Sequence, residues 1–527
     1  MRFLTASLLL VPLASAAAPL FPLRASANQR YLEDQNGVPF PILGRTAWFV
    51  ISLSAADQAT FLENTAAKGY DAIEFHVLDH DPRGNNPPFA NAGALLPFRN
   101  RIDGAAWSGS LTYANINTEA PDFTSLNEPY WVFVDQFLSA CEAKGIVVLM
   151  FPAYVGYSAG DQGWMQEMTA NGGDRMTTYG NLLATRYKNR KNIVWMMGGD
   201  MGGFTAPQQA AESGLIDGLK SVAGQQSTHF AAEWNSESIC TDQVPFGSNC
   251  TLNSTYSWAG NVSTFTRGAY ASTPTRPAFL LEEPYDEEGP DGNAVNPSAT
   301  QPVRRFQWWG VLSGIAGYVS GNGLVWPFNA GWKTHLDTQG AQDMARLNAF
   351  VATIPWWTLV PSGLGGMKTL ITAGGSNPAS ASYVAAAAAS DGTLLVAYLP
   401  PAHSSTVTVD MTAMTAPARA RWFNPASGAF SDISAALPNT GTRVFTPPGN
   451  NGTGFADWVL VLDTGSLQPC DGGSCGPAAD GGAQTDAGQT TIVEAPRAGC
   501  GCVHGTMDGS LLGAVLAAGL WRRRGRN

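Results

Sequence analysis

Residues 192–200 read Asn-Ile-Val-Trp-Met-Met-Gly-Gly-Asp, and this stretch decides the fold class. Its apolar run has the length of a buried strand, and the two glycines that follow permit a tight turn before Asp200. Residues 279–283, Phe-Leu-Leu-Glu-Glu, follow the same plan, and Pro284 ends that strand. Acids delivered by two buried strands are typical of a parallel barrel, which carries its working groups at the carboxyl ends of its strands.

Outward from this stretch, short apolar runs alternate with amphipathic stretches from residue 28 to residue 367, the pattern of βα units. The runs predicted as strands are Phe40–Trp48, Ala72–Val77, Ile146–Phe151, Ile193–Met197, Thr228–Ala232, Leu252–Tyr256, Pro277–Glu282 and Ile315–Ser320. Helices are predicted between them, for example over Ser54–Lys68 and Asn127–Lys144, each followed by glycine. Eight units of this kind predict an α/β fold, a (β/α)8 TIM barrel. A doubly wound sheet is the alternative, but no G-x-G-x-x-G turn follows the first strand.

The chain beyond the barrel changes character. Residues 368–463 contain alternating strands separated by Gly, Pro and Asn turns, which predicts a small antiparallel β-sandwich. Residues 464–498 are rich in Gly, Ala and Asp and are predicted as a flexible linker. Residues 499–527 contain two cysteines, a short apolar run and an arginine cluster. This tail resembles the C-terminal sorting tags of myxobacterial surface proteins, the MYXO-CTERM type, and would be the only contact with a membrane if it stayed unprocessed.

The amino terminus predicts export. Residues 1–16 have the basic start, apolar run and small-residue end of a secretory signal peptide, so we expect a secreted or cell-surface protein. An oxidising compartment allows disulfides, and Cys240 and Cys250 are expected to close a loop. Cys141 lies in an amphipathic stretch and is expected to be a buried free thiol.

Composition narrows the partners. The 527 residues carry a formal net charge of −11, which repels nucleic acid and strongly anionic polymers. The six histidines form no H-E-x-x-H helix; His76 and His80 are four apart but leave a strand end, so no metal and no cofactor are predicted. Residues 156–160 match G-x-S-x-G, but no helix follows at once, so a loop is favoured over a serine nucleophile. We expect a monomer.

A pair of carboxylates remains as the candidate chemistry. Cleavage of a glycosidic bond needs one protonated carboxyl group to assist the leaving oxygen and one ionised group to attack the sugar. Asp200 and Glu283, on two strands of one barrel rim, meet this demand if both face the same space. The other interpretation is that each is a surface acid at the start of a loop.

Several blocks in order resemble the apiosidase-like glycoside hydrolases of the family 140 type. They are residues 30–48, 67–70, 127–131, 179–187, 193–200, 283–285, 304–305 and 314–326. The resemblance implies a retaining TIM-barrel enzyme with Asp200 as acid/base and Glu283 as nucleophile. Glu282, where the family commonly has Gly, is the competing nucleophile. The two catalytic carboxyl groups of a retaining enzyme lie about 5 to 5.5 Å apart.

The substrate is expected to be a plant or microbial polysaccharide or oligosaccharide, and the family implies apiose-containing pectin side chains. Arg45 stands where the family usually has Asp, so either a subsite accepts an acidic sugar or Arg45 pairs internally with an acid such as Glu74. Candidate sugar-binding residues lie in that block or at or near predicted strand ends: Arg45, Trp48, His76, Tyr154, His229, Trp234, Tyr256 and Trp326.

The sandwich resembles a domain named for collagen binding in a collagenase, on the residues 421–428 and 457–463. We expect a structural module packed on the barrel, with Trp422 and Trp458 in its core. The alternative for the whole chain is a non-catalytic carbohydrate- or matrix-binding surface protein on a hydrolase scaffold, because a fold does not fix a function.

Overall fold

The structure is a computed structural model that describes residues 18–80, 89–157, 163–222, 229–258, 261–288 and 302–465. The predicted signal peptide and C-terminal tail lie outside these residues, as does nearly all of the predicted linker. Within the described ranges, no helix has the length and apolar character needed to cross a membrane.

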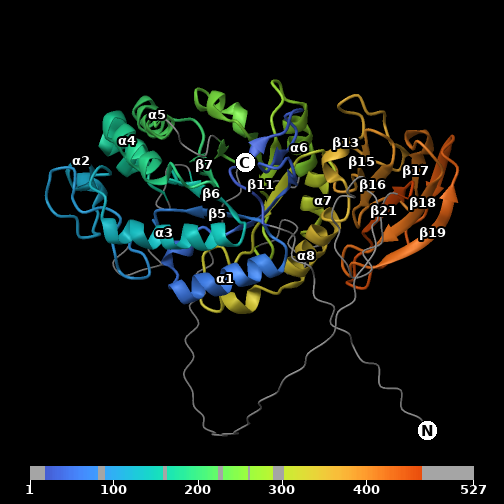
Figure 1. The fold of residues 1–527 in the computed structure, drawn as a ribbon, viewed down its shortest axis with the longest axis horizontal. Helices are drawn as coiled ribbons and strands as arrows, with labels where there is room; N and C mark the ends of the chain where they lie inside the picture. The colour runs from blue at the N-terminus through green and yellow to red at the C-terminus, as the bar shows by residue number, and fades with distance from the viewer. Residues whose placement is uncertain are drawn as a thin grey trace, which may run out of the picture. The chain divides into compact units, whose positions relative to one another are not determined.

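All eight predicted strands form, and the described residues join them with one further strand in a nine-stranded sheet (Figure 1). The strands are β4 (Ile42–Thr46), β5 (Ala72–His76), β6 (Val147–Phe151), β7 (Ile193–Gly198), β8 (Phe230–Glu233), β9 (Ser238–Ile239), β10 (Asn253–Tyr256), β11 (Ala278–Glu282) and β12 (Gly317–Ser320). Their order is β8-β7-β6-β5-β4-β12-β11-β10-β9. Neighbours from β8 through β10 pair in parallel, and β9 pairs antiparallel with β10.

The sheet curls into a nearly closed barrel of the TIM type. The backbone N–H groups of Thr251 and Leu252, just before β10, donate to the carbonyl of Phe230 at the start of β8, at 2.9 and 3.0 Å. The Ser254 hydroxyl also donates to the carbonyl of Ala232, at 2.5 Å. These bonds hold β8 and β10 together where no regular ladder connects them.

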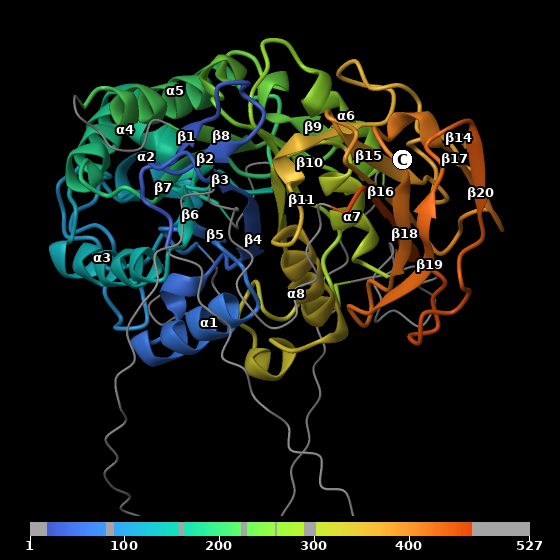
Figure 2. The ribbon, with the colours of Figure 1, turned by 45° about the vertical axis from the view of Figure 1, so that its right-hand side comes forward.

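Helices cover the outside of the barrel (Figures 1 and 2). They are α1 (Ala55–Ala67), α2 (Ile116–Glu119), α3 (Glu128–Ala143), α4 (Met165–Tyr187), α5 (Ala206–Lys220), α6 (Val262–Ala271), α7 (Arg305–Val311) and α8 (Gln339–Val351). The predictions over 54–68 and 127–144 are confirmed by α1 and α3. The Ser54 side chain caps α1 by accepting from the backbone N–H of Asp57, at 3.2 Å.

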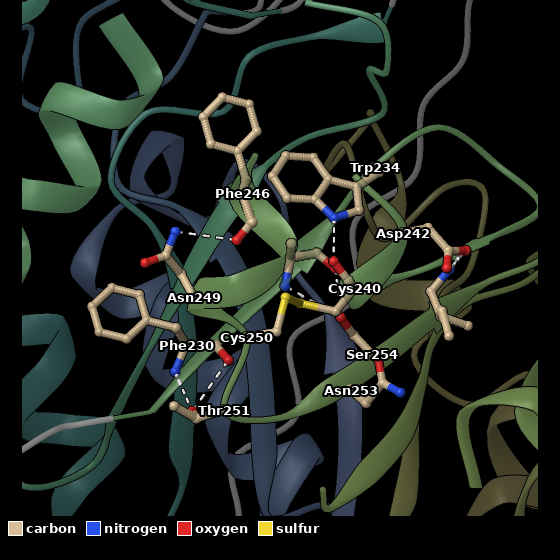
Figure 3. Close-up of a disulfide and its surroundings, with 12 residues drawn as sticks. Phe230, Trp234, Cys240, Asp242, Phe246, Asn249, Cys250, Thr251, Asn253 and Ser254 are labelled. Carbon is tan, nitrogen blue, oxygen red and sulfur yellow. Dashed lines mark hydrogen bonds between the residues drawn. A yellow bond between two sulfur atoms is a disulfide. The ribbon is translucent and has the colours of Figure 1, made fainter. Parts of the chain in front are cut away.

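The predicted strict βα alternation is broken once. Between β8 and β10, residues 234–252 are all described and contain no α-helix. They hold β9 and two 3-10 turns, η4 (Cys240–Asp242) and η5 (Phe246–Asn249). A disulfide between Cys240 and Cys250 closes this segment, which confirms the predicted pairing (Figure 3). Cys141 is a buried free thiol, as expected.

A small sheet closes the amino end of the barrel. It consists of β1 (Arg24–Ala25), β2 (Leu32–Glu33) and β3 (Pro39–Phe40), paired antiparallel. Phe21, Leu23 and Leu32 belong to the same apolar cluster as the residues that fill the barrel interior. The carboxyl ends of the strands are therefore left as the end where a ligand can enter.

The C-terminal region is β-rich. In the described part of the chain, a six-stranded antiparallel sheet has the order β13-β15-β16-β21-β18-β19, and a three-stranded sheet has the order β14-β17-β20. The strands are β13 (Leu359–Pro361), β14 (Ile371–Ala373), β15 (Ala385–Ala389), β16 (Leu394–Leu399), β17 (Val407–Asp410), β18 (Ala418–Phe423), β19 (Phe430–Leu437), β20 (Thr442–Phe445) and β21 (Trp458–Asp463). One apolar cluster contains residues of both sheets together with Trp422 and Trp458, as predicted.

The six-stranded sheet packs its other face on the barrel helices. Trp308 of α7 stacks on Tyr398 of β16, with ring centroids 5.8 Å apart and planes 4° from parallel. Arg304, just before α7, forms ion pairs with Asp343 of α8 at 2.6 Å and with Asp457 at 2.7 Å. All three side chains are at most 2% exposed, so the junction contains a buried charge network as well as apolar packing.

Candidate active site

Asp200 lies just after the carboxyl end of β7. The two residues before it have backbone conformations that favour glycine. Gly198 and Gly199 have φ values of 74° and 133°. A Cβ atom on Gly199 would lie 2.2 Å from the ring of Tyr154, so a side chain there would displace Tyr154. The N–H of Gly199 donates to the carbonyl of Glu233 at 2.7 Å, which fixes the turn to β8. Asp200 itself has φ 50°, a left-handed conformation that Asp tolerates and that often marks functional sites.

The side chains of β11 alternate between the barrel interior and the helices. Phe279 and Leu281 belong to the interior apolar cluster, and Ala278 and Leu280 to the cluster formed with the helices. Strict alternation would turn Glu282 outward and Glu283 inward. However, β11 shifts register against β10: Thr255 pairs with Leu280, but Tyr256 pairs with Glu282. One extra residue of β11 is accommodated there, and such a bulge can reverse the direction of the side chains that follow it.

Glu283 accordingly points away from the barrel interior. One carboxylate oxygen accepts a hydrogen bond from the side-chain amide of Gln307 on α7, and the other has no hydrogen-bond partner. Burial raises the pKa of the phenols of Tyr70 and Tyr318, and Glu283 raises both further. Both tyrosines belong to the cluster formed with the helices. Glu283 has no exposed surface, whereas Glu282 is 3% and Asp200 5% exposed. These contacts place Glu283 next to Gln307 of α7, and its role opposite Asp200 stays a prediction.

Glu282 instead joins a group of acids at the mouth of the barrel. Burial first, then Glu233, Asp200 and Glu282, raise the pKa of the Tyr154 phenol, so all three acids lie within electrostatic range of it. Burial, then Glu282, Glu74 and Asp200, raise the pKa of Glu233 well above its ordinary value, and a hydrogen bond with Glu282 raises it further. Burial, Glu282 and Glu283 also raise the pKa of Glu74. Burial and like charges therefore both favour the protonated forms of Glu74 and Glu233.

Aromatic rings surround this group of acids. His76 stacks on Tyr154 with centroids 4.0 Å apart, and Trp48 lies 4.6 Å from His76 and 5.8 Å from Tyr154. Trp326 reaches the cluster through Phe49, 5.8 Å away. Tyr256 contributes to the raised pKa of Tyr154, after burial and the acids. In the strand pairing it stands opposite Glu282, at the end of β10. Five of the predicted sugar-binding residues are thus gathered at the carboxyl end of the strands: Trp48, His76, Tyr154, Tyr256 and Trp326.

Two known families match the chain. Residues 26–358 match the family model described as "Apiosidase-like, catalytic domain", which covers more than half of the chain. The chain belongs to the apiosidase-like family. Residues 368–463 of this apiosidase-like protein match a second model, "Putative collagen-binding domain of a collagenase". No curated protein matches the sequence.

Solved structures show that the apiosidase-like protein has the fold of glycoside hydrolases. A family 5 glycoside hydrolase from Bacteroides vulgatus is 20% identical with a TM-score of 0.64, covering 84% of this chain and 93% of that one. A structure titled "Glycoside hydrolase" is 21% identical with a TM-score of 0.64, covering 85% of this chain and 99% of that one. Both matches extend over the barrel and the C-terminal region together.

His229 lies at the other end of the apiosidase-like barrel, which corrects its assignment as a sugar contact. It directly precedes β8, and its ring nitrogens contact the carbonyl of Leu23 at 3.2 Å and the hydroxyl of Thr251 at 3.4 Å. Burial lowers its pKa, so the ring is neutral. The residue helps to attach the amino-terminal segment to the barrel.

Trp234 is also a packing residue. Its indole N–H donates to the carbonyl of Cys240 at 2.8 Å, and its ring stacks on Phe246 at 5.6 Å (Figure 3). Only 1% of Trp234 is exposed. The side chain supports the disulfide-closed segment and is not directed at the acids.

Arg45 is turned toward α1, and the acids that act on it are not the Glu74 suggested from the sequence. Its guanidinium donates to the side chain of Asn64 on α1 at 2.8 Å and lies over the rings of Phe61 and Tyr70. Burial lowers its pKa, and the acids that oppose this shift are Asp337 and Asp286, with no contribution from Glu74. Leu43, two residues earlier, also belongs to the cluster formed with the helices, as strand alternation requires.

Glu233 is the site residue that the sequence analysis missed. It carries the signal that marked the other two acids, because residues 230–233, Phe-Ala-Ala-Glu, are an apolar strand that ends on a carboxylate. Within the described ranges, no group of three or more His, Cys, Asp or Glu side chains could hold a metal ion. The arrangement is suited to proton transfer and to nucleophilic attack by a carboxylate.

Glu212 of α5 supports the turn before Asp200 and gives a prediction about pH. It accepts a hydrogen bond from the N–H of Gly198 at 3.0 Å, and burial raises its pKa from 4.5 to about 7. The folded state therefore binds this proton more tightly than the unfolded state, so its contribution to stability is lost as pH rises from about 4.5 to about 7. Glu212→Gln keeps the acceptor and removes the proton, and should be more stable than the wild type above pH 7 by roughly 3 kcal/mol, since one pKa unit corresponds to about 1.4 kcal/mol.

Urea unfolding of both proteins at pH 4.5 and pH 8 measures this difference. The two free energies of unfolding should agree more closely at pH 4.5 than at pH 8. An equal difference at both pH values would show that Glu212 does not titrate in the folded protein.

Proposed function

We propose that this protein is an exported retaining glycoside hydrolase in which Asp200 is the acid/base and Glu282, rather than Glu283, is the nucleophile. The observation that supports this proposal is that Asp200 and Glu282 stand at the ends of the fourth and seventh parallel strands in chain order and that both, after burial and Glu233, raise the pKa of Tyr154. Two carboxyl groups at one rim are the requirement for a two-step displacement at a sugar.

In the first step, a carboxylate oxygen of Glu282 forms a bond to the anomeric carbon while the glycosidic bond breaks. Asp200 gives its proton to the departing oxygen. In the second step, Asp200 takes a proton from water, the water oxygen bonds to the same carbon, and Glu282 leaves as a carboxylate. Two inversions give net retention.

Glu233 is proposed to position the nucleophile. Burial and like charges favour its protonated form, which can donate a hydrogen bond to Glu282 and thereby favour the ionised form of Glu282. The aromatic rings of Trp48, Tyr154 and Trp326 would form the walls that hold the sugar, because a sugar ring presents C–H groups to an aromatic face.

The proposed substrate is a plant or microbial polysaccharide or oligosaccharide, with the specificity of family 140 as the first candidate. The proposed location is outside the cytoplasm. The signal-peptide pattern in residues 1–16 supports it, and so does the Cys240–Cys250 disulfide, since such bonds persist in oxidising compartments.

Hydrolysis of a panel of plant and microbial polysaccharides by the purified protein tests the proposal, with proton NMR of the first product to assign its anomeric configuration. Retention is expected. A first product of inverted configuration would exclude Glu282 as a nucleophile, and the absence of hydrolysis across the panel would favour a carbohydrate-binding protein.

Asp200→Asn should lower turnover by about 10²- to 10⁴-fold, since the amide cannot donate a proton to the leaving oxygen. The loss should be smaller for substrates with an activated aryl leaving group, which departs without protonation. A variant that loses the same factor on both kinds of substrate would show that Asp200 is not the acid. The melting temperature should match that of the wild type.

A further inference from the structure

A groove lies at the amino-terminal end of the barrel, next to the C-terminal β-rich region. Its volume is about 410 Å³, within the range of roughly 300 to 1,000 Å³ that is typical of ligand pockets. Gly314 and Ala316 in its wall directly precede β12, and Thr275 precedes β11. Because these are the amino ends of the strands, the groove is on the opposite end of the barrel from Asp200 and Glu282.

Aromatic side chains form one side of this groove. Trp357 is 38% exposed, which is unusual for such a large apolar side chain in a folded domain. Its ring is nearly perpendicular to that of Trp356, with centroids 6.0 Å apart, and Trp356 meets Tyr31 edge to face at 5.8 Å. Rings held by one another in this way present fixed apolar faces of the size of a sugar ring.

Polar groups complete the lining. Asn28, Thr275, Thr358 and Ser390 contribute amide and hydroxyl groups, and none of the described lining residues is an acid. The guanidinium of Arg30 lies 3.8 Å over the ring of Tyr270 and donates to the carbonyl of the same residue. These two contacts hold the guanidinium against the wall of the groove. Uncharged donors and acceptors beside aromatic faces suit hydroxyl-rich neutral ligands. The net charge of −11 also disfavours an anionic polymer.

We propose that this groove is a second carbohydrate-binding site, which holds a neutral polysaccharide chain on aromatic faces of Trp357 and Tyr31. The class of ligand rests on the proposed function. Such a site would keep the enzyme on a long polymer between cleavage events and would contribute nothing to the hydrolysis of a short substrate.

Native affinity electrophoresis in gels that contain arabinoxylan, galactomannan or xyloglucan tests the site, with polygalacturonate as the anionic comparison. The background is Glu282→Gln, so that the polymer is not cleaved. We expect at least one neutral polymer to retard the protein and Trp357→Ala to weaken that binding by about tenfold, which corresponds to about 1.4 kcal/mol. Tyr31→Ala should weaken it as well. Tyr113→Ala removes an aromatic side chain of similar exposure outside the groove and should bind like the parent.

Two results would overturn the site: no retardation of the parent protein by any neutral polymer, or equal retardation of the parent and the Trp357→Ala variant. The proposed function is tested separately by hydrolysis of an oligosaccharide, with Glu282 intact. Trp357→Ala should retain that activity. Binding without any hydrolysis would remove the proposed function and leave the groove as a binding site.

Discussion

Glu282→Gln is expected to lower turnover by roughly 10⁴-fold or more, because loss of one member of a catalytic unit removes most of its effect. An amide of the same shape cannot form the bond to the anomeric carbon that the proposed mechanism requires. The substrate is the one hydrolysed by the wild-type protein in the polysaccharide screen, and the measurement is the initial rate.

The adjacent residue provides a matched control. Glu283→Gln changes the same group one position away, and its amide oxygen can still accept the hydrogen bond from Gln307. Since burial raises the pKa of Glu283 well above its ordinary value, the neutral side chain of the variant resembles the form that the folded protein favours. This variant should therefore keep its turnover and its melting temperature.

Chemical rescue distinguishes the nucleophile from a residue that only positions it. Azide can occupy the space left in Glu282→Gly and attack the anomeric carbon once, so it should restore turnover and give a glycosyl azide of inverted configuration. A Glu283→Gln variant that is inactive beside an active Glu282→Gln variant would return the nucleophile to Glu283.

Arg304→Ala is expected to reduce the free energy of unfolding by about 3 to 5 kcal/mol, the usual cost of removing one partner from a buried ion pair. The substitution removes the cation that Asp343 and Asp457 share. Their carboxylates, 2% and 0% exposed, would then stay buried without it. These acids hold the pKa of Arg304 above its ordinary value, in spite of burial, so the guanidinium is charged in the wild type.

Arg346→Ala is the control, because Arg346 pairs with the same Asp343 at 2.9 Å but is 28% exposed. A partly solvated pair of this kind contributes about 0 to 1 kcal/mol. Urea denaturation followed by tryptophan fluorescence measures both variants. Equal destabilisation by the two substitutions would mean that apolar contacts such as Trp308 on Tyr398 hold the two regions together without help from the buried charges.

Much of the fold could be predicted from local patterns. Most barrel strands are short apolar runs in which both faces are buried, although β10 reads Asn-Ser-Thr-Tyr, and that composition is visible in one segment at a time. The same holds for the helices that begin after Ser54 and Asn127 and end before glycine, and for the cysteines at 240 and 250 that close the segment after β8. The missing helix between β8 and β10 had no such local signal.

The sequence could predict only which site residues lie near the ends of strands. Trp48, His76, Tyr154, Tyr256 and Trp326 are gathered at one rim because parallel strands all end on the same side. His229 and Trp234 flank the strand β8 just as closely in sequence. One precedes the strand and the other turns into the disulfide-closed segment, and sequence distance does not distinguish these cases.

Local sequence patterns indicate which segments become strands, because burial and turn formation depend on neighbouring residues. They also show an acid at the end of β7, β8 and β11, namely Asp200, Glu233 and Glu282. Only the tertiary structure decided which face each acid occupies. In β11 that choice depends on a register shift against β10, a relation between two strands that neither segment reveals alone. The extra residue in that pairing allows Glu282 to hydrogen-bond with Glu233 while Glu283 accepts from Gln307, since side chains otherwise alternate with a period of two along a strand.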